Sequence, residues 1–245
     1  MIKFFRKIRY DLMEKNKTGK YFKYAIGEIV LVVIGILIAL QINNWNESQK
    51  KHHLKNEYKI SLKNDFIKDS IQLSERINEN KQILETISET YEELKTTTFN
   101  TSDEVLSKLS EAYKGNLRTL NTYNTNSFNL LISGGNIDLL DKELREAIME
   151  LNRLQLHEIE VSSVNRESYV IISTNFRIKY PPLEFPNESL LKILWKDIET
   201  DELPKDLYTL IIRKAYTISR YLELSEEVSQ QTNVVLKLLE EQKKK

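Results

Sequence analysis

One acidic residue stands inside the most apolar stretch of this chain, and it is the first candidate for chemistry. Glu28 lies near the start of Ala25–Ile42, a stretch made mainly of Ile, Val and Leu. In a helix, positions 28, 35 and 39 share one face, so Glu28 lines up with Gly35 and Ala39. Small residues four apart let a second helix approach closely, and an acid there can accept a Lys or Arg from a partner or mark an ion path. The alternative is that Glu28 extends to the lipid headgroups while Gly35 and Ala39 pack against lipid.

The three histidines do not suggest a metal site. Di-metal helical proteins use a Glu-x-x-His motif, and the residue three before His157 is Leu154, so the motif is absent. His157 falls on the apolar stripe of a predicted helix, which favours a histidine in the core or at its edge. His52 and His53 stand beside two lysines without converging acids, and we expect an exposed pair near the membrane interface.

Enzyme signatures are missing from the sequence. It contains no Gly-rich phosphate loop, no H-E-x-x-H and no G-x-S-x-G motif, and Gly134-Gly135 is better interpreted as a helix cap. Scattered acids such as Asp65 and Asp69 fit the solvated faces of helices. With no cysteine, disulfides and thiolate metal sites are excluded. We therefore expect a non-enzymatic protein without a metal or cofactor.

The apolar stretch is long enough to cross a bilayer. As a helix, Ala25–Ile42 covers about 27 Å, close to the hydrocarbon thickness. The uninterrupted run Ile29–Leu40 would also suit a buried core helix or a signal peptide, but Leu37-Ile38-Ala39 lacks the small residues of a cleavage site. We therefore expect an uncleaved signal-anchor. Aromatic residues suited to the two membrane interfaces flank it: Tyr21, Tyr24 and Trp45.

Charge predicts the orientation of this anchor. Positive charge is concentrated before the stretch, so the positive-inside rule places residues 1–23 in the cytoplasm, 24–45 in the membrane and 46–245 outside the cytoplasm, in a bacterium in the periplasm. Across the chain, 36 basic and 36 acidic residues balance, which gives no field to attract nucleic acid. The basic residues on the N-terminal side are Lys3, Arg6, Lys7, Arg9, Lys15, Lys17, Lys20 and Lys23.

The remainder of the chain has the pattern of a helical domain. Glycine and proline are scarce, and apolar residues recur at spacings of three and four. We expect an all-α fold: an N-terminal transmembrane helix followed by an elongated antiparallel helical bundle with a coiled-coil-like seam. Whether the transmembrane helix continues into the first helix of the bundle stays open. The expected helices are 47–94, 101–115 behind a capping box, 127–132, 141–175, a short one around 190–195, and a last one after Pro204.

Each long helix has an apolar stripe that predicts its buried face. In the first helix the pattern also uses Ser70 and Asn80 to fill gaps. The stripes are Phe66, Leu73, Ile77, Leu84, Ile87, Tyr91 and Leu94; then Leu140, Leu144, Ala147, Ile148, Leu151, Leu154, Val161, Val164 and Ile171; and finally Leu207, Ile211, Ile218, Tyr221, Val228, Val235 and Leu239.

Four short segments resemble a known family. The order of Gly, Glu, Gln, Asn and Trp in Tyr24–Ile29 and Leu40–Glu47, the opening Met1–Arg9 and, more loosely, Ser133–Leu140 resemble an uncharacterised family of single-pass membrane proteins of Gram-negative bacteria, a domain of unknown function. The resemblance implies an inner-membrane anchor with a periplasmic helical domain. It implies no activity.

These observations lead to two functional hypotheses. The first is a non-enzymatic membrane-anchored interaction or scaffold protein of the cell envelope, in contact with lipid and with an envelope protein or a second copy of itself. The alternative is a ligand-binding, sensor-like helical domain. Because the cytoplasmic segment is so short, a sensor would need a partner to pass on its signal.

Overall fold

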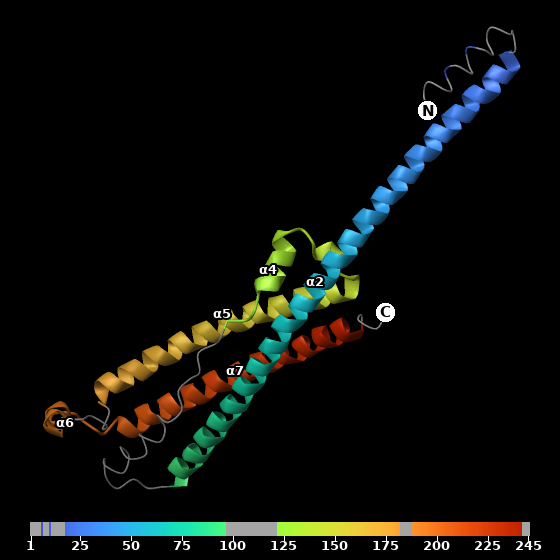
Figure 1. Ribbon diagram of the computed structural model, residues 1–245. Coiled ribbons are helices and arrows are strands. Elements are labelled where there is room, and N and C mark those ends of the chain that lie inside the picture. Colours follow the sequence, from blue (N-terminus) through green and yellow to red (C-terminus); the bar gives the residue numbers. More distant parts are fainter. Residues whose placement is uncertain (1–5, 7–9, 11–17, 97–121, 182–187, 242–245) are drawn as a thin grey trace. The chain divides into compact units, whose positions relative to one another are not determined.

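The computed structural model describes residues 6, 10, 18–96, 122–181 and 188–241, and these residues are almost entirely helical (Figure 1). No strand occurs in these ranges, which confirms the all-α prediction. The chain divides into two units, Met1–Glu57 and Tyr58–Lys245. The elements in order are α2 (Thr18–Thr96), α4 (Asn126–Ser133), the 3₁₀ turn η1 (Ile137–Leu139), α5 (Lys142–Lys179), α6 (Glu188–Trp195) and α7 (Leu203–Glu241).

Helix α2 answers the question that the sequence leaves open. It is one helix of 79 residues, so the apolar stretch and the first long polar helix form a single element. No proline lies within it, and no glycine follows Gly35, so nothing in the sequence breaks its hydrogen-bond ladder. Within Phe22–Glu93 lies a stretch that is long and apolar enough to cross a membrane, and none of that stretch is buried inside the protein.

The unit that begins at Tyr58 buries two hydrophobic clusters. Both draw residues from α2, α5 and α7. The start of α5 shares the first cluster with the end of α7, and the end of α5 shares the second cluster with the start of α7, so these helices run in opposite directions (Figure 1). The first cluster contains Leu62, Phe66, Leu73, Tyr123, Leu131, Leu140, Leu144, Ile148, Leu151, Val228, Val235 and Leu239; the second contains Ile87, Phe176, Tyr180, Leu203, Leu207, Leu210, Ile211, Ile218 and Leu222.

Gly134 and Gly135 end helix α4 as the sequence predicts. Gly135 has φ of 66°, a left-handed conformation that favours glycine. The Asn136 N–H donates to Leu131 O at 3.0 Å, and the Gly135 N–H donates to Ile132 O at 3.0 Å. This pair of bonds is a Schellman motif, and it satisfies carbonyl groups that the helix end would leave unpaired.

The buried face of α7 is predicted correctly, but that of α5 is predicted correctly only in its first half. Every apolar residue of the α7 stripe is buried. In α5, Val164 and Ile171 are 63% and 54% exposed, so their assignment to the core is wrong. The spacing of three and four from Leu144 to Leu151 instead continues through three polar residues, Gln155, Glu158 and Ser162, which are buried.

The remaining boundaries differ from the prediction by a few residues. Helix α5 extends to Lys179, beyond the expected end at residue 175. Helix α7 begins at Leu203, which places Pro204 in the first turn, where its missing N–H costs no hydrogen bond. The helix expected over 101–115 and its capping box lie outside the described residues, as do Pro182 and Pro186.

Candidate functional site

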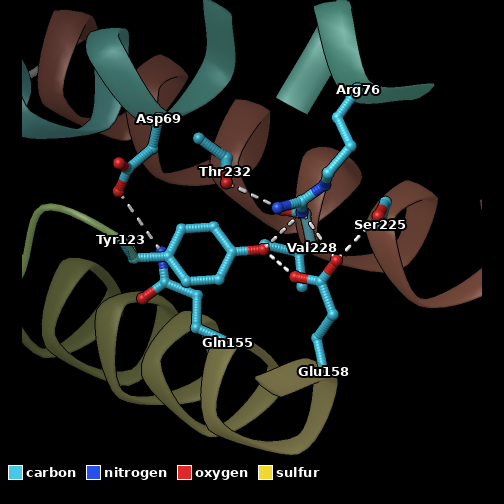
Figure 2. Close-up of polar contacts among 8 residues, drawn as sticks. All are labelled: Asp69, Arg76, Tyr123, Gln155, Glu158, Ser225, Val228 and Thr232. Atoms are coloured by element: carbon cyan, nitrogen blue, oxygen red, sulfur yellow. Dashed lines mark hydrogen bonds and ion pairs between the residues drawn. The ribbon is translucent and has the colours of Figure 1, made fainter. Parts of the chain in front are cut away.

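A layer of buried polar side chains separates the two hydrophobic clusters. Its centre is an ion pair between Arg76 of α2 and Glu158 of α5, with Nη2 and Oε1 2.6 Å apart (Figure 2). Ser225 of α7 donates to the same Oε1 at 2.7 Å. The Tyr123 hydroxyl accepts a hydrogen bond from Arg76 Nη2 at 3.0 Å and donates to Glu158 Oε2. The carboxylate is thus bonded to partners from α2, from α7 and from the segment that precedes α4.

This ion pair lies deep in the protein. Glu158 is 0% exposed and Arg76 is 7% exposed. Burial raises the pKa of the Glu158 carboxyl, while the charge of Arg76 and the hydrogen bonds from Ser225 and Arg76 oppose that rise. The guanidinium carbon of Arg76 also lies 5.8 Å from the centre of the Tyr123 ring. The pair and the hydrogen bond from Ser225 connect α2, α5 and α7, and removing one partner of the pair would leave an uncompensated buried charge.

A second carboxylate extends this layer toward α4. Asp69 Oδ1 accepts from Asn124 N at 3.0 Å and from Asn124 Nδ2 at 2.7 Å, and Gln155 Nε2 lies 3.5 Å from Oδ2. Burial raises the pKa of Asp69, and the bonds from Asn124 oppose the rise. The prediction that Asp69 lies on a solvated face is wrong. Its side chain is 1% exposed and accepts hydrogen bonds from the segment that precedes α4.

Asp65 is half-buried, so the prediction of a solvated face is also too simple for this residue. Its Oδ2 accepts from the Ser127 backbone N at 3.3 Å and from Ser127 Oγ at 2.5 Å. Ser127 lies in the first turn of α4, where backbone N–H groups have no partner within the helix. Asp65 of α2 therefore caps α4 from outside.

The polar layer positions helices and presents no exposed reactive group. Both oxygens of Glu158 accept hydrogen bonds, and the described ranges contain no group of three or more His, Asp or Glu residues that could hold a metal ion. Lys214 of α7 is also buried, and desolvation lowers its pKa to about 8. None of these side chains lines the groove described below.

An open groove is the second candidate site. It has a volume of about 750 Å³ and lies over α4, η1 and the first half of α5. Arg145 Nη1 is paired with Asp138 at 2.5 Å, and Arg153 is paired with Glu150 at 2.7 Å, so the charges at its edge are held in place. The lining is apolar with a polar edge: Ile132, Ile137, Met149 and Leu156, with Arg145, Glu146, Glu150, Asn152 and Arg153.

The site residues predicted from the sequence all lie in α2. Gly35 and Ala39 are exposed, and a Cβ added at Gly35 would meet no other atom within 4 Å. Glu28 is half-buried. Tyr24 and Trp45 are exposed, while the side chain of Tyr21 lies outside the described part of the chain. Their roles at a membrane or a partner interface stay predictions.

The histidines lie apart from both candidate sites. His157 is exposed, so its assignment to the core or its edge is wrong; it stands on the outer side of α5, one residue before the buried Glu158. His52 and His53 are exposed, as predicted. An acid does approach one of them, because His53 Nε2 lies 3.3 Å from Glu57 Oε1.

The sequence reasoning missed the centre of the polar layer. The sequence did contain a signal for Arg76 and Glu158. If polar residues are included, steps of three and four lead from Phe66 to position 76 and from Leu144 to position 158. Tyr123 had no comparable signal. It lies in a polar, non-helical segment, where periodicity carries no information.

These features define a class: an all-helical protein with one N-terminal helix apolar enough to cross a membrane and a helical unit whose core contains a buried ion pair. Within that class, the chain belongs to a family of unknown function, DUF6090, whose model matches residues 28–180. The resemblance to an uncharacterised domain family is thereby confirmed, whereas its single-pass topology and Gram-negative origin stay predictions. No curated protein and no solved structure matches the chain.

Proposed function

We propose that this protein is a non-enzymatic, membrane-anchored interaction protein that acts as a scaffold in the cell envelope. In this proposal residues 1–23 are cytoplasmic, the apolar part of α2 is a single-pass anchor in the bacterial inner membrane, and residues 46–245 form an elongated antiparallel bundle in the periplasm. The groove over α4, η1 and α5 is the observation that carries the proposal.

The groove has the properties of a surface that binds another protein. Met149 and Leu156 are 47% and 58% exposed, so apolar area at this place is not used by the protein's own core. Apolar surface with a polar edge is typical of interaction sites. Since charges of both signs lie at the edge, the partner that fits is an amphipathic helix of another envelope protein with apolar residues on one face and mixed charges beside them.

Crosslinking from the groove tests this function. A photoreactive residue at position 156, in the full chain in its native membrane, should give a discrete protein adduct. Position 164 is the matched control, because Val164 is equally exposed on the same helix but does not line the groove. The substitution Met149→Glu should abolish the adduct from position 156. Equal labelling from both positions, or none from position 156, would contradict the proposal.

The exposed face of the apolar part of α2 gives a second place for contact. Gly35 and Ala39 would let a partner helix approach, and Glu28 on the same face would accept its Lys or Arg. A photoreactive residue at position 35 should then give a protein adduct that weakens with Glu28→Gln. Lipid adducts alone would reduce this helix to a simple anchor.

A sensor-like domain is the second candidate, and one observation favours it. Helix α2 is uninterrupted between the apolar stretch and Arg76, so one element links the anchor to the buried ion pair. A ligand that changed the packing around Arg76 would act on that same helix. Melting of the full chain against a panel of small molecules tests this candidate: a ligand-dependent rise in melting temperature supports it over a scaffold.

A further inference from the structure

Three buried polar atoms near the Arg76–Glu158 pair have no hydrogen-bond partner among the described residues: Arg76 Nε, Asn80 Oδ1 and Ser162 Oγ. Asn80 is 1% exposed and Ser162 is 0% exposed. Leaving a buried polar group unpaired destabilises a protein, so three in one region require an explanation.

The helix register brings these atoms to adjoining layers of the core. Asn80 follows Arg76 by one turn of α2, and Ser162 follows Glu158 by one turn of α5. Helix α7 contributes one residue to each layer. Ser225 donates a hydrogen bond to Glu158. Tyr221, which lies one turn from Ser225, donates to Ser162 O at 3.1 Å. The layer of Asn80, Ser162 and Tyr221 therefore lies one helical turn from the layer of the ion pair.

The Ser162 hydroxyl differs from other buried hydroxyls on these helices. Thr90, Thr217 and Thr232 donate to the carbonyl oxygen four residues back, as with the bond from Thr232 Oγ1 to Val228 O at 2.7 Å in Figure 2. Such a bond is the usual solution for a hydroxyl inside a helix. Ser162 does not make this bond, and its hydroxyl has no partner among the described residues.

We propose that Arg76, Asn80 and Ser162 bind one structural water molecule between α2 and α5. The water accepts from Arg76 Nε–H, donates to Asn80 Oδ1 and forms its third hydrogen bond with Ser162 Oγ. Three bonds to otherwise unpaired groups are typical of a buried water.

The charges of the region select a neutral ligand. A cation would meet the guanidinium of Arg76, which is already paired with Glu158. An anion would meet the carboxylate of Glu158 and the amide oxygen of Asn80. A neutral molecule that both donates and accepts satisfies all three atoms, and water is the smallest such molecule.

Substitution of Ser162 gives opposite results with and without the water. In the full chain in detergent micelles, Ser162→Ala should lower the melting temperature by about 2–4 °C if the hydroxyl is hydrogen-bonded. If the hydroxyl is unpaired, its removal should leave the melting temperature unchanged or raise it, which would overturn the proposal. Ser225→Ala is the matched control, because its hydroxyl bonds Glu158 and its loss must destabilise.

The double variant tests whether Ser162 and Asn80 share one water. Asn80→Leu keeps the side-chain size while removing the amide. If both residues hold the same molecule, Ser162→Ala with Asn80→Leu should lower the melting temperature by clearly less than the sum of the single shifts. Additive shifts would overturn a shared ligand.

A direct readout covers the case in which Asn80→Leu does not fold. The Arg76 Nε–H of the unsubstituted chain should give an NMR cross-relaxation peak with a long-lived water molecule. A resolved Arg76 Nε–H signal without that peak would also overturn the proposal.

Discussion

Helix α2 contains two regions that contrast: one exposes apolar side chains, and the other buries polar ones. From Phe22 to Trp45 it is apolar, and its large side chains are exposed. From Tyr58 onward it is rich in charge, and Asp69, Arg76 and Asn80 are almost completely buried. In the first region the residue types alone carry the information, because the stretch is long and apolar enough to cross a membrane. In the second, Asp69 and Arg76 are inside because partners from α5 and from the segment before α4 meet them there.

The largest effect expected in the second region comes from breaking the ion pair. Arg76→Met leaves the Glu158 carboxylate buried without its cation, and the free energy of unfolding should fall by about 4 kcal/mol. Urea titration of the full chain in detergent, followed by circular dichroism, measures it. Lys81→Met is the control: its exposed 2.8 Å pair with Glu226 joins α2 to another long helix, α7, and its loss should cost less than about 1 kcal/mol.

Replacing both charges sharpens this result. Arg76→Met with Glu158→Leu removes the uncompensated carboxylate, so the double variant should be more stable than Arg76→Met alone. If the two variants unfold at the same urea concentration, the charge of Glu158 is not the cause of the loss.

Leucines in the two regions should differ almost as strongly. Leu73 is 1% exposed in the first hydrophobic cluster, and Leu73→Ala should cost about 3 kcal/mol through lost burial and a residual cavity. Leu37 belongs to the exposed apolar stretch, and Leu37→Ala should leave the unfolding of the helical unit unchanged. An equal loss in the same urea titration would show that the apolar stretch packs into the core.

A pH effect of intermediate size should arise from Lys214. Burial lowers its pKa to about 8 from an ordinary 10.5, so its stabilising contribution is complete above pH 10.5 and is lost as the pH falls through about 8. Relative to Lys214→Met, the free energy of unfolding of the unsubstituted chain should rise by on the order of 2 kcal/mol as the pH increases across this range. Melting measured from pH 7.5 to 10.5 tests the slope. The exposed Lys237, as Lys237→Met, should keep the slope of the unsubstituted chain.

The smallest effect should come from glycine. Gly135 has positive φ and precedes Asn136, whose Nδ2 lies 3.1 Å from the Tyr58 hydroxyl of α2. Gly135→Ala should cost about 1 kcal/mol from backbone strain alone, since no atom lies within 4 Å of the added Cβ. Gly27→Ala, in the apolar part of α2, should leave the unfolding of the helical unit unaffected. A loss with Gly27→Ala and none with Gly135→Ala would reverse the expected contrast.

Periodicity could predict a helix face as long as apolar residues marked it. Most buried residues of α7 are apolar, so its stripe could be identified, although Lys214, Thr217, Ser225 and Thr232 are buried on that helix as well. In α5 the apolar residues change faces after Leu151: Val164 and Ile171 point outward, and the inner positions become Gln155, Glu158 and Ser162. Beyond Leu151, the apolar residues therefore marked the exposed side of α5. The buried side kept its spacing of three and four, but with polar residues.

The partners of these polar residues could not be predicted from one segment at a time. Glu158 is tolerated inside because Arg76, Tyr123 and Ser225 converge on it from three separate parts of the chain. The groove has the same origin, since Ile132 and Ile137 come from α4 and η1 while Met149 and Leu156 come from α5. Each depends on how distant segments assemble.

The opposite courses of α5 and α7 have a practical consequence for experiments on the family. The family model ends at residue 180, yet Val228, Val235 and most of the second cluster belong to α7. A fragment cut at Tyr180 would present the inner face of α5 to solvent and should aggregate. The limit of recognisable similarity and the limit of the folding unit therefore differ, and an expression fragment needs to extend through Glu241.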